Sequence, residues 1–195
     1  MQNWPPMPGD YKVLEEESKV AIVTLTSNPE DFGIPEAAIV GSLKTENLGI
    51  ERIIVNIISN PKIRAFILCG KESQGHYAGQ ALLSVWKNGA DENMKINGAK
   101  GPIPYLENIT QEAIARFQRQ ITIMEDMIGE LDQKTVSIKA REINAMTLPS
   151  FDEEPMYAAQ RKESKKTVVS GAENMLVLPG GFVVDPVSFS IRQAV

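Results

Sequence analysis

The chain has very little cysteine and histidine, two residue types that often form catalytic and metal sites. Its 195 residues include one cysteine, Cys69, and one histidine, His76. A lone cysteine cannot form an intramolecular disulfide, which fits a reducing, cytoplasmic setting. A lone histidine excludes a metal site built from several histidines of one chain, and it leaves no second imidazole to serve as a base for a nucleophile.

Other absences narrow the possible functions further. No run of about 18 apolar residues indicates a membrane span, and the start of the chain lacks the basic-then-apolar pattern of a signal peptide. The sequence holds no phosphate loop of the GxxxxGK[ST] type, no GxGxxG after a predicted strand and no nucleophile elbow. The net charge of −5 argues against nucleic acid as a main partner.

The hydrophobic pattern predicts an α/β fold. Short apolar runs at 20–26 and 63–68 predict buried strands. A helix is predicted after each, with Thr45 as the N-cap of the first. The second is expected to start at His76, with Gly89 just past its end. A third helix is expected to begin at Asn108 as N-cap. The alternation predicts a parallel sheet flanked by helices.

The rest of the chain completes the expected organisation. The first dozen residues are read as an extended lead-in, and residues 27–42 as a loop with one helical turn. A fourth helix is predicted after Asp132, with a strand as the alternative, and a short strand near Met127 is left open. We expect a domain over 1–148, a polar linker over 149–170 and a small β-rich, hairpin-like extension over 171–195.

The stretch CGKESQGHYAGQ, residues 69–80, follows the second predicted strand directly. Ligands of open parallel sheets bind at the carboxyl ends of the strands, so His76 lies where this fold class places its chemistry. Gly70, Gly75 and Gly79 surround it. Spacing alone leaves two interpretations open, a structural imidazole and a ligand or acid–base group. Cys69 is expected to be a small buried residue.

A single histidine is sufficient for a cofactor that brings its own equatorial ligands, as haem and corrinoids do. Residues 74–79 read QGHYAG, which is similar to the D-x-H-x-x-G motif of many corrinoid-dependent methyltransferases. In that motif the histidine binds cobalt and the aspartate orients it. Gln74 stands at the aspartate position, and its carbonyl oxygen is expected to accept the imidazole N–H without supplying a negative charge.

Four segments resemble the A-subunit of tetrahydromethanopterin S-methyltransferase, a corrinoid protein family. They are WPPMPGDYKV, KTENLGIERIIVNIISNPKIRAFILCG, ESQGHYAGQAL and NGADENMKINGAKGPIPYLENI, in that order over about residues 4–130. The resemblance implies a Rossmann-like domain that binds a cobamide such as cobalamin, with His76 as a switchable axial ligand of cobalt. It also implies methyl transfer between a methylated pterin or folate and the cob(I)amide, and onward to a thiol such as coenzyme M.

The same resemblance implies a set of residues around the cofactor, with His76 as both catalytic residue and metal ligand. The implied set is Thr24, Leu25, Thr26, Ser27, Thr45, Glu46, Asn47, Gly70, Glu72, Gln74, Gly75, His76, Gln80, Gly98, Ala99, Gly101, Pro102, Ile103 and Pro104.

The sequence departs from that family at its C-terminal end, where a transmembrane helix is expected and none is predicted. Two explanations are open, an anchor that was truncated and a soluble relative, and the β-rich tail favours the second. We therefore expect a soluble, cytoplasmic relative that works with the pterin- or folate-dependent subunit of a methyltransferase and with a second, substrate-specific methyltransferase. Two alternatives remain open: a non-catalytic corrinoid store or sensor, and a nucleotide-binding α/β domain without a corrinoid.

Overall fold

The computed structural model describes residues 4–157, 176–178, 182–184 and 191–193, in two units. The larger unit spans Met1–Arg161 and contains a five-stranded sheet. In the other unit, Lys162–Val195, three short strands pair antiparallel: β6 (Leu176–Leu178), β7 (Phe182–Val184) and β8 (Ile191–Gln193). The rest of the expected linker and C-terminal extension lies outside the described residues.

The sheet of the larger unit has the strand order β1-β3-β2-β4-β5. Its strands are β1 (Tyr11–Val13), β2 (Val20–Val23), β3 (Ile39–Gly41), β4 (Ala65–Leu68) and β5 (Ile123–Asp126). Four of them are parallel, and β1 pairs antiparallel with β3 at the edge. The predicted α/β class is confirmed, but the sheet is mixed where a parallel one was expected.

The two strands that the sequence did not reveal, β1 and β3, are three residues long. Three residues are too few for an alternating or continuous apolar pattern to stand out. β1 lies close behind three prolines and was expected to be part of an extended lead-in, and β3 was expected to lie in a loop. The helical turn expected in that loop is the 3₁₀ helix η1 (Pro29–Phe32).

Four α-helices flank the sheet: α1 (Leu48–Ile58), α2 (Ala78–Asn88), α3 (Gln111–Gln120) and α4 (Gln133–Ala145). All four predicted helices are present, and Gly89 and Asp132 are the C-cap and N-cap that were expected. Two expected N-caps are wrong. Asn47, not Thr45, caps α1, and Thr110, not Asn108, caps α3. The side chain and backbone of Asn108 instead hydrogen-bond the buried Glu51 carboxylate of α1.

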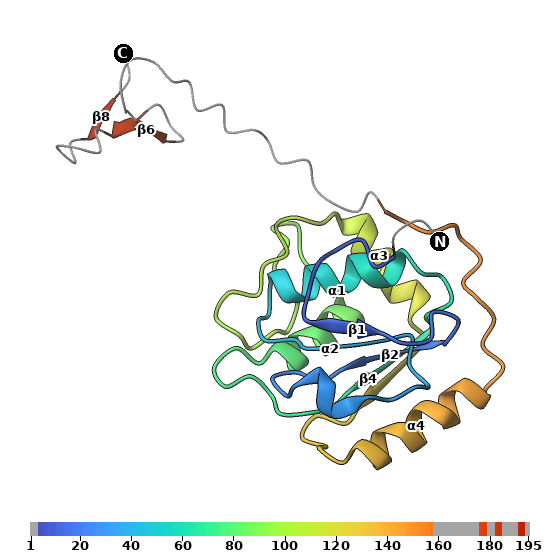
Figure 1. The fold of residues 1–195 in the computed structure, drawn as a ribbon. Helices are drawn as coiled ribbons and strands as arrows, with labels where there is room; N and C mark the ends of the chain where they lie inside the picture. The colour runs from blue at the N-terminus through green and yellow to red at the C-terminus, as the bar shows by residue number, and fades with distance from the viewer. Residues whose placement is uncertain (1–3, 158–175, 179–181, 185–190, 194–195) are drawn as a thin grey trace. The chain divides into compact units, whose positions relative to one another are not determined.

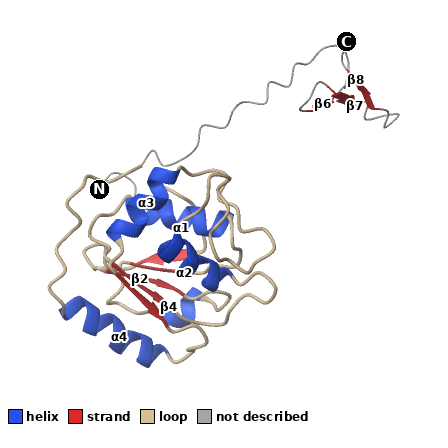
Figure 2. Cartoon of the chain, turned by 180° about the vertical axis from the view of Figure 1, so that it is seen from behind, coloured by secondary structure: helices blue, strands red, loops and turns tan. Residues whose placement is uncertain are grey.

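The helices cover the two faces of the sheet unequally. Figures 1 and 2 show α4 on one side of the sheet and α1, α2 and α3 on the other. Alternate side chains of β2 point to the two faces of the sheet. Ala21 and Val23 pack in the core with α1–α3, while Val20 and Ile22 pack with η1 and α4. Within the described ranges, no helix has the length and apolarity that crossing a bilayer requires.

The first residues of the expected linker, 149–157, pack on the larger unit and are called the strap below. The backbone N–H of Phe151 donates to the Pro61 carbonyl at 2.9 Å, and that of Met156 donates to Ile58 at 3.0 Å. The Phe151 ring lies 4.4 Å from the guanidinium carbon of Arg116 and 5.4 Å from that of Arg64. The pattern of charges and prolines in this segment indicated a linker, but it did not show these partners.

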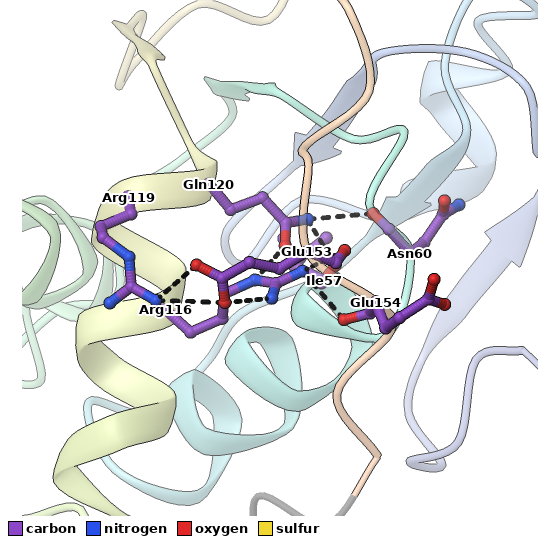
Figure 3. Close-up of polar contacts among 7 residues, drawn as sticks. All are labelled: Ile57, Asn60, Arg116, Arg119, Gln120, Glu153 and Glu154. Carbon is purple, nitrogen blue, oxygen red and sulfur yellow. Dashed lines mark hydrogen bonds and ion pairs between the residues drawn. The ribbon is translucent and has the colours of Figure 1, made fainter.

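Arg116 joins the strap to the core, as Figure 3 shows. Its side chain is 1% exposed and donates to Glu153 Oε2 at 2.7 Å and to Gln120 Oε1 at 3.1 Å. Gln120 in turn donates to the carbonyls of Ile57, Asn60 and Ile63. A buried guanidinium with these partners is satisfied, so the cluster has a structural explanation.

The parallel strands lie in the order β3-β2-β4-β5, so the connections from β2 and β4 run in opposite directions across the sheet. The crevice between the carboxyl ends of such a strand pair is where doubly wound sheets bind ligands. The loops at 24–27 and 69–77 follow these two strands, and the candidate site is built from them.

Candidate functional site

His76 lies at the end of the loop between β4 and α2, which we call the histidine loop (residues 69–77). Gly75 and Tyr77, on either side of it, have φ angles of +79° and +52°. Tyr77 is also the N-cap residue of α2 and offers no side-chain cap. The helix expected to start at His76 therefore begins at Ala78, and His76 lies on an irregular turn just ahead of it.

Two other side chains of the loop satisfy the free N–H groups at the start of α2. The Glu72 carboxylate accepts from the backbone N–H groups of Gly79 and Gln80, each at 3.0 Å. The Ser73 hydroxyl accepts from Ala78 N–H, also at 3.0 Å. Glu72 therefore has a structural role that suits a carboxylate at a helix N-terminus. These bonds hold the backbone around His76 in place.

The imidazole of His76 is paired with a carboxylate from another loop. Its Nδ1 lies 2.8 Å from Glu46 Oε2, and Glu46 Oε1 accepts from Ile103 N–H at 2.9 Å. The Glu46 side chain is 1% exposed, whereas that of His76 is 51% exposed. Nε2 makes no hydrogen bond with the part of the chain that the structure describes. The carboxylate favours the tautomer with the proton on Nδ1, because it accepts the hydrogen bond from that nitrogen, and in this tautomer Nε2 carries the free lone pair.

Glu46 remains ionised in spite of its burial. Burial alone would raise its pKa, but hydrogen bonds from Ile103 N–H, from its own backbone N–H and from the His76 ring outweigh that effect. The net result is a pKa below the ordinary value of 4.5. The imidazole is thus supported by a negative charge in a buried position, as in carboxylate–histidine pairs behind metal ligands.

The partner of His76 was expected to be Gln74, and this expectation is wrong in the structure. Gln74 is exposed, and its side chain makes no hydrogen bond with any described residue. The acid comes from position 46, thirty residues earlier in the chain. The imidazole was also expected to have no negatively charged partner, and this expectation is wrong because Glu46 is ionised.

The loop at 97–104, which we call the covering loop, packs against both partners. A Cβ added at Gly101 would lie 2.3 Å from the His76 carbonyl oxygen and 2.8 Å from Glu46 Cγ, so only glycine fits there. Gln80 fixes the same loop, since its side chain donates to the Gly98 carbonyl at 3.0 Å and accepts from Lys100 N–H at 2.9 Å. Gly101 and Gln80 therefore hold the covering loop against the His76–Glu46 pair.

The loop after β2 is joined to the start of the histidine loop. Thr26 donates to the Lys71 carbonyl through its N–H and its hydroxyl, and the Ser27 hydroxyl accepts from Lys71 N–H. Gly70, at φ +78°, has the Thr24 carbonyl oxygen 2.1 Å from the position of a Cβ. The expected site residues of these two loops therefore lie side by side.

The remaining residues expected at the cofactor lie in different places, from the protein interior to the surface. Leu25 is fully buried in the core, Thr24 is buried with its hydroxyl donating to the Ser27 carbonyl, and Thr45 lies beside a cavity described below. Asn47 accepts from Leu48 N–H as the α1 cap. Gly98 and Pro102 are exposed, Ala99 is half-buried and Pro104 is buried.

Sequence reasoning missed two features around His76. One is the role of Glu46, which was expected only at the cofactor rim. The other is a group of exposed apolar side chains, Leu48, Tyr77 and Ile103, which are 52%, 45% and 58% exposed. Each follows or contacts a residue of the pair, because Leu48 opens the helix after Glu46, Tyr77 follows His76, and Ile103 donates to Glu46. The only sequence signal was their position next to the motifs.

The described residues support neither a cysteine nucleophile nor a metal site with several acidic, histidine or cysteine ligands. Burial raises the pKa of Cys69 to about 12, so its thiol is not a nucleophile at neutral pH, as the sequence predicted. Among the described residues, no group of three or more histidine, cysteine, aspartate and glutamate side chains is arranged to hold a metal ion. An imidazole that acts as the only protein ligand to a metal is compatible with both observations.

Comparison with known proteins identifies the family. The family of the tetrahydromethanopterin S-methyltransferase A-subunit, MtrA, matches residues 1–167. A relative from Methanosarcina acetivorans, described as the A-subunit of a proposed methyltransferase Mtx, is 43% identical and covers 94% of this chain and 91% of its own length. The A-subunit 2 of tetrahydromethanopterin S-methyltransferase from Methanobrevibacter ruminantium is 45% identical over 85% of this chain and 88% of its own length. This chain therefore belongs to the MtrA family of tetrahydromethanopterin S-methyltransferase subunits.

Proposed function

We propose that the chain is the corrinoid-binding methyl carrier of a methyltransferase, with His76 as the axial ligand of cobalt. The observation that carries the proposal is the His76–Glu46 pair. The buried carboxylate oxygen lies 2.8 Å from Nδ1, and Nε2, on the other side of the half-exposed ring, is left open. An imidazole oriented by a carboxylate and open on its other nitrogen is the arrangement that metal-ligating histidines use.

The surroundings of His76 fit a large, flat cofactor. Gly75 has no atom within 4 Å of the position that a Cβ would take, so the backbone beside His76 faces open space. The exposed side chains of Leu48, Tyr77 and Ile103 offer apolar surface around the imidazole. The covering loop adds Pro102 and Ile103, which are both exposed, to the surface beside the His76–Glu46 pair.

In this proposal each residue has a defined task. The corrinoid, when bound, supplies a cobalt centre that can accept and release a methyl group. His76 offers Nε2 as the axial donor, and Glu46 fixes the tautomer and strengthens the donor by holding the Nδ1 proton. Ile103 N–H and the packing of Gly101 hold Glu46 in position. Because the His76 side chain is half exposed, it could bind and release the cobalt centre while Glu46 stays buried.

The spectrum of the reconstituted protein tests the proposal. The chain is loaded with hydroxocobalamin, and its visible spectrum is compared with those of His76→Ala, Glu46→Gln and Gln74→Ala. We expect His76→Ala to remove the signature of histidine ligation and Glu46→Gln to weaken the axial bond by about 10–100-fold. Gln74→Ala is the matched control in the same loop and should leave the spectrum unchanged. Failure of the wild type to bind a corrinoid, or an unchanged His76→Ala spectrum, refutes the proposal.

We further propose that a pterin- or folate-dependent methyltransferase subunit is the partner. Leu48, Tyr77 and Ile103 make an exposed apolar rim around the histidine, which suits contact with a second protein during transfer. The test is methyl transfer from a methyl-tetrahydropterin to the corrinoid-loaded chain in the presence of such a subunit. Turnover rules out a purely storing or sensing role, and corrinoid binding without turnover supports that alternative.

A further inference from the structure

A second candidate site lies between α1 and the edge of the sheet, and its lining includes Thr45 and Leu48, on either side of Glu46 and Asn47 in the chain. It is a cavity of about 350 Å³ under the first turns of α1 and beside β1 and β3. This volume falls within the range of small-molecule sites. Its walls come from the N-terminal segment around Gly9 and Tyr11, from the sheet and from α1. No residue of the His76–Glu46 pair or of the covering loop lines it.

The inner walls of the cavity are apolar. The sheet contributes Ala21, Val23 and the Phe66 ring, and α1 contributes Ile53 and Ile57. All five belong to the core layer of α1–α3 or pack against it. A flat apolar group would therefore find hydrocarbon on both sides, from the sheet and from the helix.

The N-terminal segment that closes the cavity is firmly attached. The indole N–H of Trp4 donates to the Asn56 carbonyl at 2.7 Å, and the Asn56 amide exchanges hydrogen bonds with the backbone of Met7 at 2.7 and 3.1 Å. The Tyr11 hydroxyl donates to the Met7 carbonyl at 3.0 Å. The wall is therefore part of the folded domain, and the shape of the cavity is set before any ligand arrives.

The polar groups among the lining residues carry an excess of positive charge. Arg52 is exposed and makes no ion pair or hydrogen bond with the described part of the chain. Lys44 also lines the cavity, but its ammonium group lies 3.3 Å from the Asp10 carboxylate and is largely balanced by it. One unbalanced cation remains, which suits an anion with a single charge.

From these observations we propose that the cavity binds a flat apolar ring that carries one phosphate or carboxylate, with the ring between α1 and the sheet and the anion at Arg52. Two sources offer this chemistry: a free small molecule, and the nucleotide tail of a cobamide, which joins a heterocyclic base to a phosphodiester. The binding site itself does not depend on the function of His76. Only the choice of the tail as the source rests on the proposed function.

Direct binding of one probe tests the site. The benzimidazole nucleotide α-ribazole 3′-(methyl phosphate), a phosphodiester with a single charge, is titrated into the full chain by calorimetry, alongside the same nucleoside without phosphate. We expect saturable binding of the nucleotide, weakened at least tenfold by Arg52→Ala, while binding of the neutral nucleoside changes less than twofold. Lys87→Ala removes an exposed helical cation that does not line the cavity and should leave both affinities unchanged.

A second variant tests the position of the ring. Ala21→Leu adds volume to the sheet wall and should abolish binding of both compounds, provided that circular dichroism shows a folded chain. The proposal is overturned if the nucleotide does not bind, or if neither Arg52→Ala nor a folded Ala21→Leu weakens its binding. Arg52 is exposed, so Arg52→Ala is expected to fold. The test therefore gives an answer even if Ala21→Leu does not fold.

Competition with cobalamin separates the two sources. If cobalamin displaces the nucleotide and cobinamide, which lacks the tail, does not, the cobamide tail is the ligand. If the nucleotide and cobalamin bind together, the site serves a free molecule. If the nucleotide binds in the Arg52-dependent manner and cobalamin does not bind at all, the cavity proposal holds and the proposed function fails.

Discussion

Replacing Glu46 with glutamine should destabilise the domain, because both carboxylate oxygens are used. One oxygen faces the imidazole Nδ1 of His76 at 2.8 Å and the other accepts from Ile103 N–H at 2.9 Å. Glutamine has one oxygen and one NH₂ group, so in Glu46→Gln either one donor meets another donor, or the imidazole moves its proton to Nε2 and the hydrogen bond to a charged carboxylate is lost. The side chain is 1% exposed, so water cannot replace the lost bond.

The size of the effect follows from the exposure of the two partners. Loss of a hydrogen bond to a buried charged group costs about 1.5–3 kcal/mol. The His76 side chain is 51% exposed, so its share is closer to about 1 kcal/mol. We expect Glu46→Gln to lower the free energy of unfolding by about 2 kcal/mol, or the melting temperature by about 4–8 °C.

Urea denaturation of four proteins checks this reasoning: wild type, Glu46→Gln, His76→Ala and the double variant. In the His76→Ala background the glutamine can turn its oxygen to Ile103, so its cost should fall to about 1 kcal/mol. Glu107→Gln, at an exposed position whose side chain makes no hydrogen bond with the described residues, should cost less than about 0.5 kcal/mol. An equal cost of Glu46→Gln in both backgrounds would mean that the Glu46–His76 pair does not exist in solution.

The pH dependence provides a second check on Glu46. Its folded-state pKa lies below the ordinary value of 4.5, so the unfolded chain takes up the proton first as the pH falls. The contribution of the carboxylate is therefore complete above about pH 4.5 and is lost as the pH falls through the folded-state pKa. The difference in stability between wild type and Glu46→Gln should stay large near neutral pH and shrink in acid. A difference that grows in acid would contradict the assignment.

Three further predictions concern other parts of the domain. Gly101→Ala should lower the free energy of unfolding in urea by about 1–3 kcal/mol, because its Cβ would lie 2.3 Å from the His76 carbonyl oxygen. Gly33→Ala is the control and should be nearly neutral, since no atom lies within 4 Å of its Cβ position. Equal costs of the two variants would contradict the packing at Gly101. The Cys69 thiol, with a pKa of about 12, should resist alkylation at pH 8 in the folded chain and react in urea; fast labelling without urea would show that it is accessible. Phe151→Ala should lower stability by about 1–2 kcal/mol through lost contact with two guanidinium groups, and no change in melting temperature would show that the strap is detached.

The sequence predicted those parts of the fold that have long and regular patterns. The isoleucines of α1, including Ile50, Ile54 and Ile58, repeat at helical spacing and are buried in the structure. The continuous apolar run of β4 predicted a strand covered on both faces, which it is. β1 and β3 were not predicted, because three residues carry too little pattern and their pairing depends on strands elsewhere in the chain.

The candidate site was only partly predictable for a related reason. The fold class placed His76 at a strand end, and the glycine at position 101 was expected near the cofactor. The partner of the imidazole was not found, because a local motif directs attention to the residue two positions earlier. Glu46 reaches His76 across α1 and β4, a contact that only the tertiary structure creates. The strap was missed because its binding depends on the buried Arg116, not on its own composition.

The long separation between Glu46 and His76 has a consequence for how the protein matures. An acid two residues from a histidine can orient the ring in a locally ordered peptide, but an acid thirty residues away can do so only after α1 and β4 have packed. The nascent or partly folded chain therefore carries an imidazole without its carboxylate. If His76 is the metal ligand that we propose, its carboxylate-supported form is available only in the finished domain, and ligation would report that folding is complete.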